Sequence, residues 1–145
     1  MVEAIIAAGA ALLGTLVGGL TQWIMVRSAQ TAATRETSRA AVATLAAALA
    51  DHRRAMWVRE DARLDGAELE RLDTLRDASH ATRAAITVPL TLLCLATPSL
   101  ATVARDAAAA TYAMRHPATR ADLTRLREDA MTAEQRLIDS AGQII

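Results

Sequence analysis

An aspartate and a histidine stand three residues apart in the second half of the chain, a spacing that can hold a metal ion. Asp77 and His80 form this pair, and side chains at i and i+3 share one face of a helix. Di-iron helical bundles need two such pairs and two further carboxylates. Neither His52 nor His116 has an acid three residues before it. The sequence therefore predicts no metal centre, and His80 is interpreted as an exposed or hydrogen-bonded side chain.

The remaining reactive residue types point to no enzyme. Cys94 is the single cysteine and lies in an apolar run, where a thiol behaves as a small hydrophobic group. A lone cysteine also excludes a disulfide scaffold. Glycines after residue 19 are limited to Gly66 and Gly142, so there is no glycine-rich phosphate loop. We predict no catalytic residue and no cofactor.

The densest run of charges, residues 51–61, is the strongest candidate for a binding surface. Arginine beside tryptophan is common at protein interfaces, which predicts a partner surface of His52, Arg53, Arg54, Trp57 and Arg59. In a second interpretation the run is a solvated face of arginine–carboxylate pairs with Trp57 in the core. In a third, the arginines contact a nucleic-acid backbone. Residues 27–64 carry seven Arg and four acids, an excess too small to favour nucleic acid.

The composition indicates one helical domain. The chain has 145 residues, of which 35 are Ala and 16 are Arg, with no Lys; 16 acids bring the net charge to zero. Aromatic and β-branched residues are too few for an all-β domain. Zero net charge disfavours a general nucleic-acid binder.

The N-terminal segment predicts a membrane anchor. Ala4–Val26 is 23 residues without a charge, and a helix of that length spans about 34 Å, against about 30 Å for the hydrocarbon core. A signal peptide, which should begin with basic residues, and a buried core helix are the alternatives. Arg27, Arg35 and Arg39 follow the segment, whereas Glu3 precedes it. This asymmetry predicts a single-pass protein of the cell membrane with residues 27–145 in the cytoplasm.

Small residues line the predicted anchor in two stripes. Stripes of this kind let helices approach closely in lipid, which predicts self-association, although Ala and Gly are frequent throughout the chain. The residues assigned to this contact are Ala7, Ala10, Ala11, Gly14, Gly18 and Gly19.

After residues 1–26, residues 27–145 are predicted to form an antiparallel bundle of about four helices, with 27–41 as a stalk. Breaks are expected at Asp65-Gly66, Thr97-Pro98 and His116-Pro117. Thr97 is predicted to cap a helix with Pro98 in its first turn, and Thr119 with Asp122 resembles a capping box. A helix beginning near Ala67 should be kinked or ended near Pro89. Its expected core side is Leu69, Leu72, Leu75, Ser79, Ile86, Leu90 and Leu93.

Residues 84–104 form a second uncharged stretch, 21 residues long. Its length suits a membrane segment, but Pro89, Pro98 and several hydroxyl groups interrupt it. We favour a buried helical corner of the bundle.

The chain resembles the KilB-type proteins encoded on conjugative plasmids and integrated elements of actinomycetes. The resemblance rests on the Gly/Ala-rich N-terminal segment and on residues 50–61, 79–87 and 109–113. It implies a membrane-associated accessory to plasmid transfer or to spread between hyphal compartments. It implies toxicity when expression is uncontrolled, and it assigns no role to any residue.

These observations favour a non-enzymatic, membrane-anchored protein that associates with itself, with the bilayer and with a plasmid transfer apparatus. A holin-like pore is the first alternative, for which leakage caused by residues 1–30 alone would be diagnostic. A small nucleic-acid-binding regulator is the second, which steep salt dependence of DNA binding would support.

Overall fold

The computed structural model describes the backbone of residues 2–144 and the side chains of residues 32–144. Over that backbone the chain forms four α-helices and one short 3-10 helix, and it forms no strand. The elements are α1 (Val2–Leu64), α2 (Leu69–Ala96), η1 (Pro98–Leu100), α3 (Ala101–Tyr112) and α4 (Arg120–Ile144). The predicted all-α class with four helices is confirmed. The chain divides into two compact units, residues 1–36 and 37–145.

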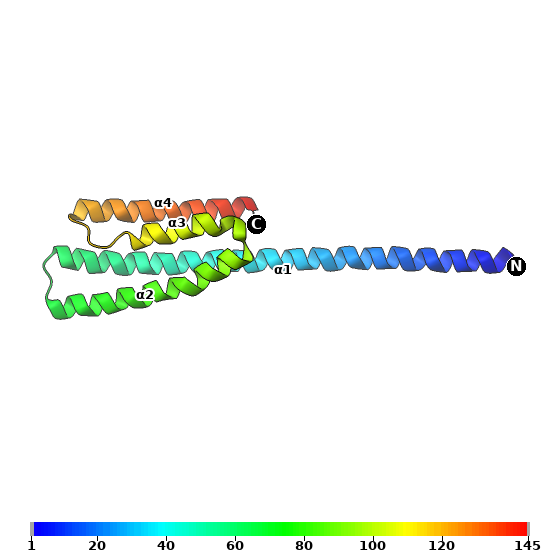
Figure 1. Ribbon diagram of the computed structural model, residues 1–145, viewed down its shortest axis with the longest axis horizontal. Coiled ribbons are helices and arrows are strands. Elements are labelled where there is room, and N and C mark those ends of the chain that lie inside the picture. Colours follow the sequence, from blue (N-terminus) through cyan, green and yellow to red (C-terminus); the bar gives the residue numbers. More distant parts are fainter. Residues whose placement is uncertain (1, 145) are drawn as a thin grey trace. The chain divides into compact units, whose positions relative to one another are not determined.

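In the unit formed by residues 37–145, consecutive helices run antiparallel (Figure 1). α3 packs against both α2 and α4. The main core takes one stripe from each helix. It contains Val42, Leu45, Leu49, Ile86, Leu93, Leu100, Ala104, Ala107, Ala108, Ala133, Leu137 and Ala141. The alanines of α3 allow a close approach between helices, because a methyl side chain takes little space.

The inward stripe of α1 changes from apolar to polar along the helix. Val42, Leu45 and Leu49 are buried, and the same three- and four-residue spacing continues through His52, Met56 and Glu60, which are also buried. Helical periodicity therefore places an imidazole and a carboxylate inside the bundle. Both groups need polar partners there.

The three predicted breaks are confirmed. The chain turns at Asp65-Gly66, where Gly66 has φ +72°, a backbone region open to glycine at no steric cost. α3 ends at Tyr112, and His116 has φ 54° in the turn before Pro117. The backbone N–H of Asp122 donates to Thr119 Oγ1 at 3.1 Å. This is the capping contact that the sequence predicts at the start of α4.

Two expectations for α2 and its end are wrong. Leu69 is 80% exposed, because it opens α2 beyond the packed part of the bundle. Of the two outcomes expected near Pro89, the helix does not end there but continues to Ala96, and its second half is curved (Figure 1). Thr97 precedes Pro98 as predicted, but its side chain caps no helix; its hydroxyl donates to Ser38 Oγ at 2.8 Å instead.

Residues 84–104 form the corner made by the end of α2, η1 and the start of α3. Ile86, Leu93 and Leu100 are fully buried there, whereas Val88, Leu92 and Leu95 are exposed. No helix in the part of the chain with described side chains is long and apolar enough to cross a membrane. The predicted anchor, residues 4–26, and its small-residue stripes lie outside the residues whose side chains are described.

Candidate functional site

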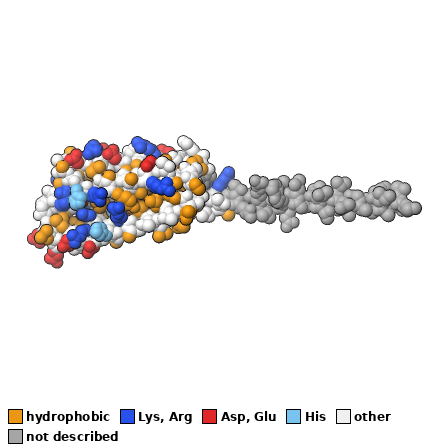
Figure 2. Space-filling model, viewed as in Figure 1, with side chains coloured by type: hydrophobic (Ala, Val, Ile, Leu, Met, Phe, Trp, Pro, Cys, Tyr) orange, Lys and Arg blue, Asp and Glu red, His pale blue; other side chains and the backbone are white. Residues whose placement is uncertain are grey.

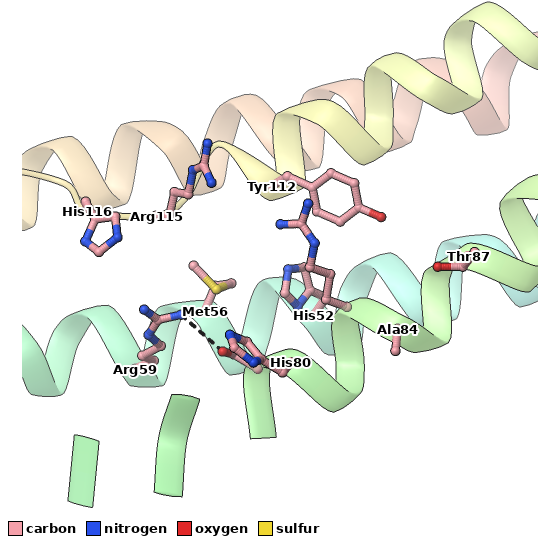
Figure 3. Close-up of a pocket in the computed structure, with 11 residues that line it drawn as sticks. His52, Met56, Arg59, His80, Ala84, Thr87, Tyr112, Arg115 and His116 are labelled. Atoms are coloured by element: carbon pink, nitrogen blue, oxygen red, sulfur yellow. Dashed lines mark hydrogen bonds between the residues drawn. The ribbon is translucent and has the colours of Figure 1, made fainter. Parts of the chain in front are cut away.

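A groove of about 670 Å³ opens between α1, α2 and the end of α3. Arginine and histidine side chains gather near the end of the bundle where α1 turns into α2 (Figure 2). Figure 3 shows Arg59 and His80 on one side of the groove, Arg115 and His116 on the other, and Met56 between them. The lining residues are His52, Met56, Arg59, Ser79, His80, Arg83, Ala84, Thr87, Tyr112, Arg115 and His116.

His52 forms part of the floor of this groove. The side chain is almost fully buried, with Nδ1 3.0 Å from Thr82 Oγ1. Its ring meets that of Tyr112 edge to face, with centroids 5.7 Å apart. Burial, then the charges of Arg83 and Arg59, lower the pKa of His52 from 6.5 to about 4, against a weaker opposing hydrogen bond that the ring donates to the Ser79 backbone. His52 is therefore neutral at pH 7.

Arg83 and Tyr112 join α2 to α3 at the upper wall of the groove. The guanidinium carbon of Arg83 lies 4.1 Å from the centroid of the Tyr112 ring. Such cation–π contacts are worth about 0.5–2 kcal/mol, depending on exposure. The contact holds Arg83 over the groove while leaving its N–H donors without a carboxylate.

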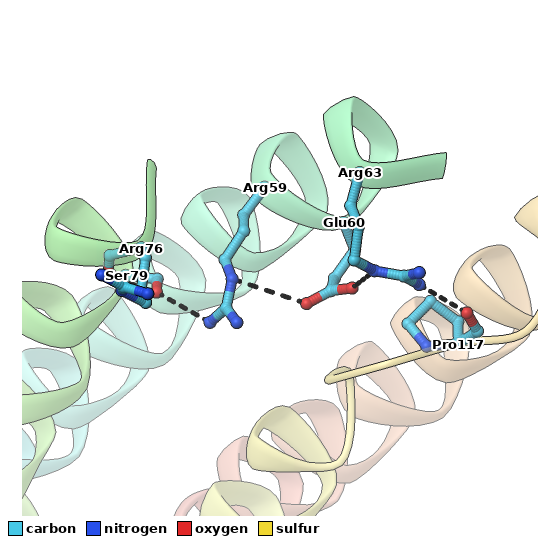
Figure 4. A network of polar contacts seen from close by, with 6 residues as sticks. All are labelled: Arg59, Glu60, Arg63, Arg76, Ser79 and Pro117. Atoms are coloured by element: carbon cyan, nitrogen blue, oxygen red, sulfur yellow. Dashed lines mark hydrogen bonds and ion pairs between the residues drawn. The ribbon is translucent and has the colours of Figure 1, made fainter. Parts of the chain in front are cut away.

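A buried carboxylate organises the other wall (Figure 4). Glu60 is fully buried and pairs with Arg63 Nε at 2.6 Å and with Arg59 Nε at 3.6 Å. Arg59 also donates to Ser79 Oγ at 3.2 Å, and Arg63 donates to the carbonyl oxygen of Pro117 at 2.6 Å. The network therefore fixes Arg59 against α2 and ties α1 to the turn that carries His116.

The five residues of the predicted partner surface do not share one face. His52 and Arg59 line the groove. Arg53 pairs with Glu134 of α4, and Trp57 is half-buried beneath the guanidinium of Arg127, 4.8 Å away. Arg54 is exposed beside Asp51. Their role in binding a partner stays a prediction.

Sequence reasoning missed most of the groove. Arg83, Tyr112 and Arg115 were not singled out, because no spacing along the chain links them to His52; only the folded bundle brings them together. The burial of Glu60 could have been predicted from the sequence, because Glu60 continues the three- and four-residue spacing of the buried residues of α1. His80, half of the Asp-x-x-His pair, lines the groove. Within residues 32–144 no group of three or more His, Cys, Asp or Glu could hold a metal ion.

The fold and the groove define a small all-helical protein with a polar, arginine-lined recess. Residues 39–145 match the family model described as KilB plasmid transfer protein. The chain is also similar to Protein KilB of Streptomyces lividans, with 48% identity over 143 residues that cover 99% of this chain and 97% of the relative. The chain belongs to the KilB plasmid transfer protein family. No solved structure matches it.

Proposed function

We propose that this protein is a non-enzymatic, membrane-anchored accessory to conjugative plasmid transfer or to plasmid spread within the mycelium. The observation that carries the proposal is the extent of the similarity to the Streptomyces lividans relative. It covers 99% of the chain, whereas the family model begins only at residue 39. The uncharged N-terminal segment is thus inside the region shared with a protein of the plasmid transfer family.

Membrane anchoring is supported by the sequence of this segment. Ala4–Val26 contains no charged residue, and a helix pairs its backbone N–H and C=O groups internally, as the water-free bilayer core requires. Arg27, Arg35 and Arg39 follow it, which favours an orientation with the bundle in the cytoplasm.

Self-association is supported by two features. The first is the small-residue pattern of the anchor, in which Gly14 and Gly18 form a GxxxG pair. The second is an exposed apolar strip on α2, where Val88, Leu92 and Leu95 are 64%, 55% and 74% exposed at spacings of four and three residues. Figure 2 shows hydrophobic side chains along this part of the bundle. The strip carries no charge, so two copies can pair through it without like-charge repulsion.

The test compares transfer of the conjugative element that encodes the protein with the gene intact, deleted, and complemented. A deletion should lower transfer or spread, and the full-length chain should restore it. A chain in which Leu12 and Leu13 are replaced by Arg should fail to restore it and should leave the membrane fraction. As a matched control, Arg substitutions at the exposed positions Thr124 and Gln135 should restore both. Full activity of the Leu12/Leu13 variant outside the membrane would contradict the anchored role.

A pore is the competing account of the same anchor. Leakage of the membrane on expression of residues 1–30 alone would favour it. An intact membrane together with lost transfer in the deletion would favour the accessory role.

A further inference from the structure

All three histidines of the chain line one groove, although they come from different elements. His52 belongs to α1, His80 to α2, and His116 to the turn after α3. Arg59, Arg83 and Arg115 come from the same three parts of the bundle and line the same groove. Six basic side chains therefore converge on one recess from sequence positions up to 64 residues apart.

No carboxylate that could balance these charges is among the described lining residues. The chain has as many acids as arginines, 16 of each, yet none of the described lining residues is Asp or Glu. Arg59 reaches Glu60 behind the wall at 3.6 Å. In the described part of the chain, neither Arg83 nor Arg115 forms an ion pair with a carboxylate. The lining residues of the groove therefore carry a formal charge of +3 from three arginines when every histidine is neutral.

Two of the three arginines are held in place by contacts with the bundle. Tyr112 holds Arg83 by its ring, and Ser79 and Glu60 hold Arg59. His116 has φ 54°, a conformation that is uncommon outside glycine. Positioning of like charges around a recess raises the energy of the empty site. An anion that enters it removes that repulsion.

The groove also has the size and the lining of a small-molecule site. Ligand pockets commonly measure about 300–1,000 Å³, a range that includes the about 670 Å³ found here. Met56, Ala84 and the ring of Tyr112 supply apolar surface beside the guanidinium groups. Planar guanidinium donors match the oxygen atoms of phosphate.

We infer that this groove binds a small phosphorylated molecule, with its phosphate or diphosphate group between Arg83, Arg115 and Arg59 and its organic part against Tyr112 and Met56. A small ligand is favoured over a nucleic-acid strand because the basic groups surround a recess. Among the lining residues, the basic groups do not form an extended row, which contacts to successive phosphates of a nucleic-acid strand would need.

The test is calorimetric titration of the full-length protein, in a neutral mild detergent, with inorganic pyrophosphate. We expect saturable binding of one pyrophosphate per chain. Arg83→Gln and Arg115→Gln should each weaken it by about tenfold or more, the usual effect of removing a charged hydrogen-bond donor. Arg136→Gln, an exposed arginine of α4 outside the groove, is the matched control and should bind as the parent does. Arg83→Lys, which keeps the charge, should recover part of the affinity and guards against misfolding of the glutamine variant.

A second readout separates binding in the groove from general charge attraction. Pyrophosphate should shift the NMR signals of the His52 and His80 rings, and the Arg115→Gln variant should lose these shifts. Absence of saturation up to about 10 mM pyrophosphate, beyond the weak end of specific affinities, would overturn the inference. Equal weakening by Arg136→Gln would also overturn it. The chain could instead bind only a DNA duplex or phosphatidylglycerol vesicles, with this binding weakened by substitution of Arg83 and Arg115. That result would show that the groove contacts a polyanion, and it would contradict a small ligand.

Discussion

Arg63 of α1 donates a hydrogen bond of 2.6 Å to the carbonyl oxygen of Pro117, in the turn between α3 and α4. The same guanidinium pairs through Nε with the fully buried Glu60. One side chain thus pairs with a buried carboxylate and contacts a turn 54 residues away. Glu60 also pairs with Arg59 at 3.6 Å, which connects this contact to the wall of the groove.

Arg63→Met should destabilise the bundle by about 2–3 kcal/mol, because it leaves the buried Glu60 carboxylate with only its longer ion pair, 3.6 Å to Arg59. Glu60→Gln with Arg63→Met should recover part of the loss, since the buried charge is then absent. The measurement is urea unfolding of the full-length chain in neutral detergent. Arg120→Met is the control: Arg120 pairs with Asp61 and Asp65 on the surface, where ion pairs contribute little. Equal losses for Arg63 and Arg120 would contradict the network.

The predicted turns and the helix type came from local chemistry, and they were correct for local reasons. Gly66 adopts a positive φ at no steric cost, and Pro98 and Pro117 restrict φ and lack a backbone N–H, so these three mark ends of helices for local reasons. The prediction that Leu69 lies in the core was wrong, because the spacing of apolar residues along one helix does not show where the neighbouring helices end.

The groove could not be predicted from the sequence, because its residues are distant along the chain. His52, Arg83 and Arg115 are separated by about 30 residues at each step, and only the packing of α1, α2 and α3 makes them neighbours. Thr97 shows the same limit on a smaller scale. Its position before Pro98 predicts a helix cap. In the structure the Thr97 hydroxyl instead donates a hydrogen bond to Ser38, 59 residues away.

Folding stability should fall as the pH drops through the range from 6.5 to 4. The native pKa of His52 is about 4 and its ordinary value is 6.5, so the unfolded chain binds the proton first. The free energy of unfolding therefore decreases in this range, by about 2 kcal/mol at pH 4.5 from this group. Urea midpoints at several pH values test this. His52→Gln should flatten the dependence, whereas His80→Gln should leave it unchanged; a parallel slope in the His52 variant would exclude this assignment.

Two adjacent residues of α4 test the register of the core. Leu137 is fully buried in the main cluster, whereas Ile138 is 40% exposed. Leu137→Ala should cost about 2–5 kcal/mol, because it removes buried methyl groups and leaves a cavity. Ile138→Ala should cost much less. Thermal unfolding of the two variants decides the matter, and the reverse order would show that α4 is rotated.

Thr119→Ala should destabilise the start of α4. The threonine hydroxyl oxygen accepts the Asp122 N–H, and the hydroxyl in turn lies 2.9 Å from Asp122 Oδ2. Loss of such a cap costs about 1 kcal/mol. Thr119→Ser keeps the oxygen and should retain most of the stability. Hydrogen exchange of the amides at residues 121–123 reports the change directly, and identical exchange in the Ala and Ser variants would argue against a capping role.

The most direct test of membrane-anchored self-association is the mass of the full-length protein extracted from membranes in mild detergent. We predict that it is found in the membrane fraction and elutes as a discrete oligomer. Gly14→Leu with Gly18→Leu should reduce the mass, while Gly9→Leu, which helical spacing places on another face, should not. A protein recovered without the membrane fraction, or a monomer in detergent whose mass none of these substitutions changes, would contradict the account.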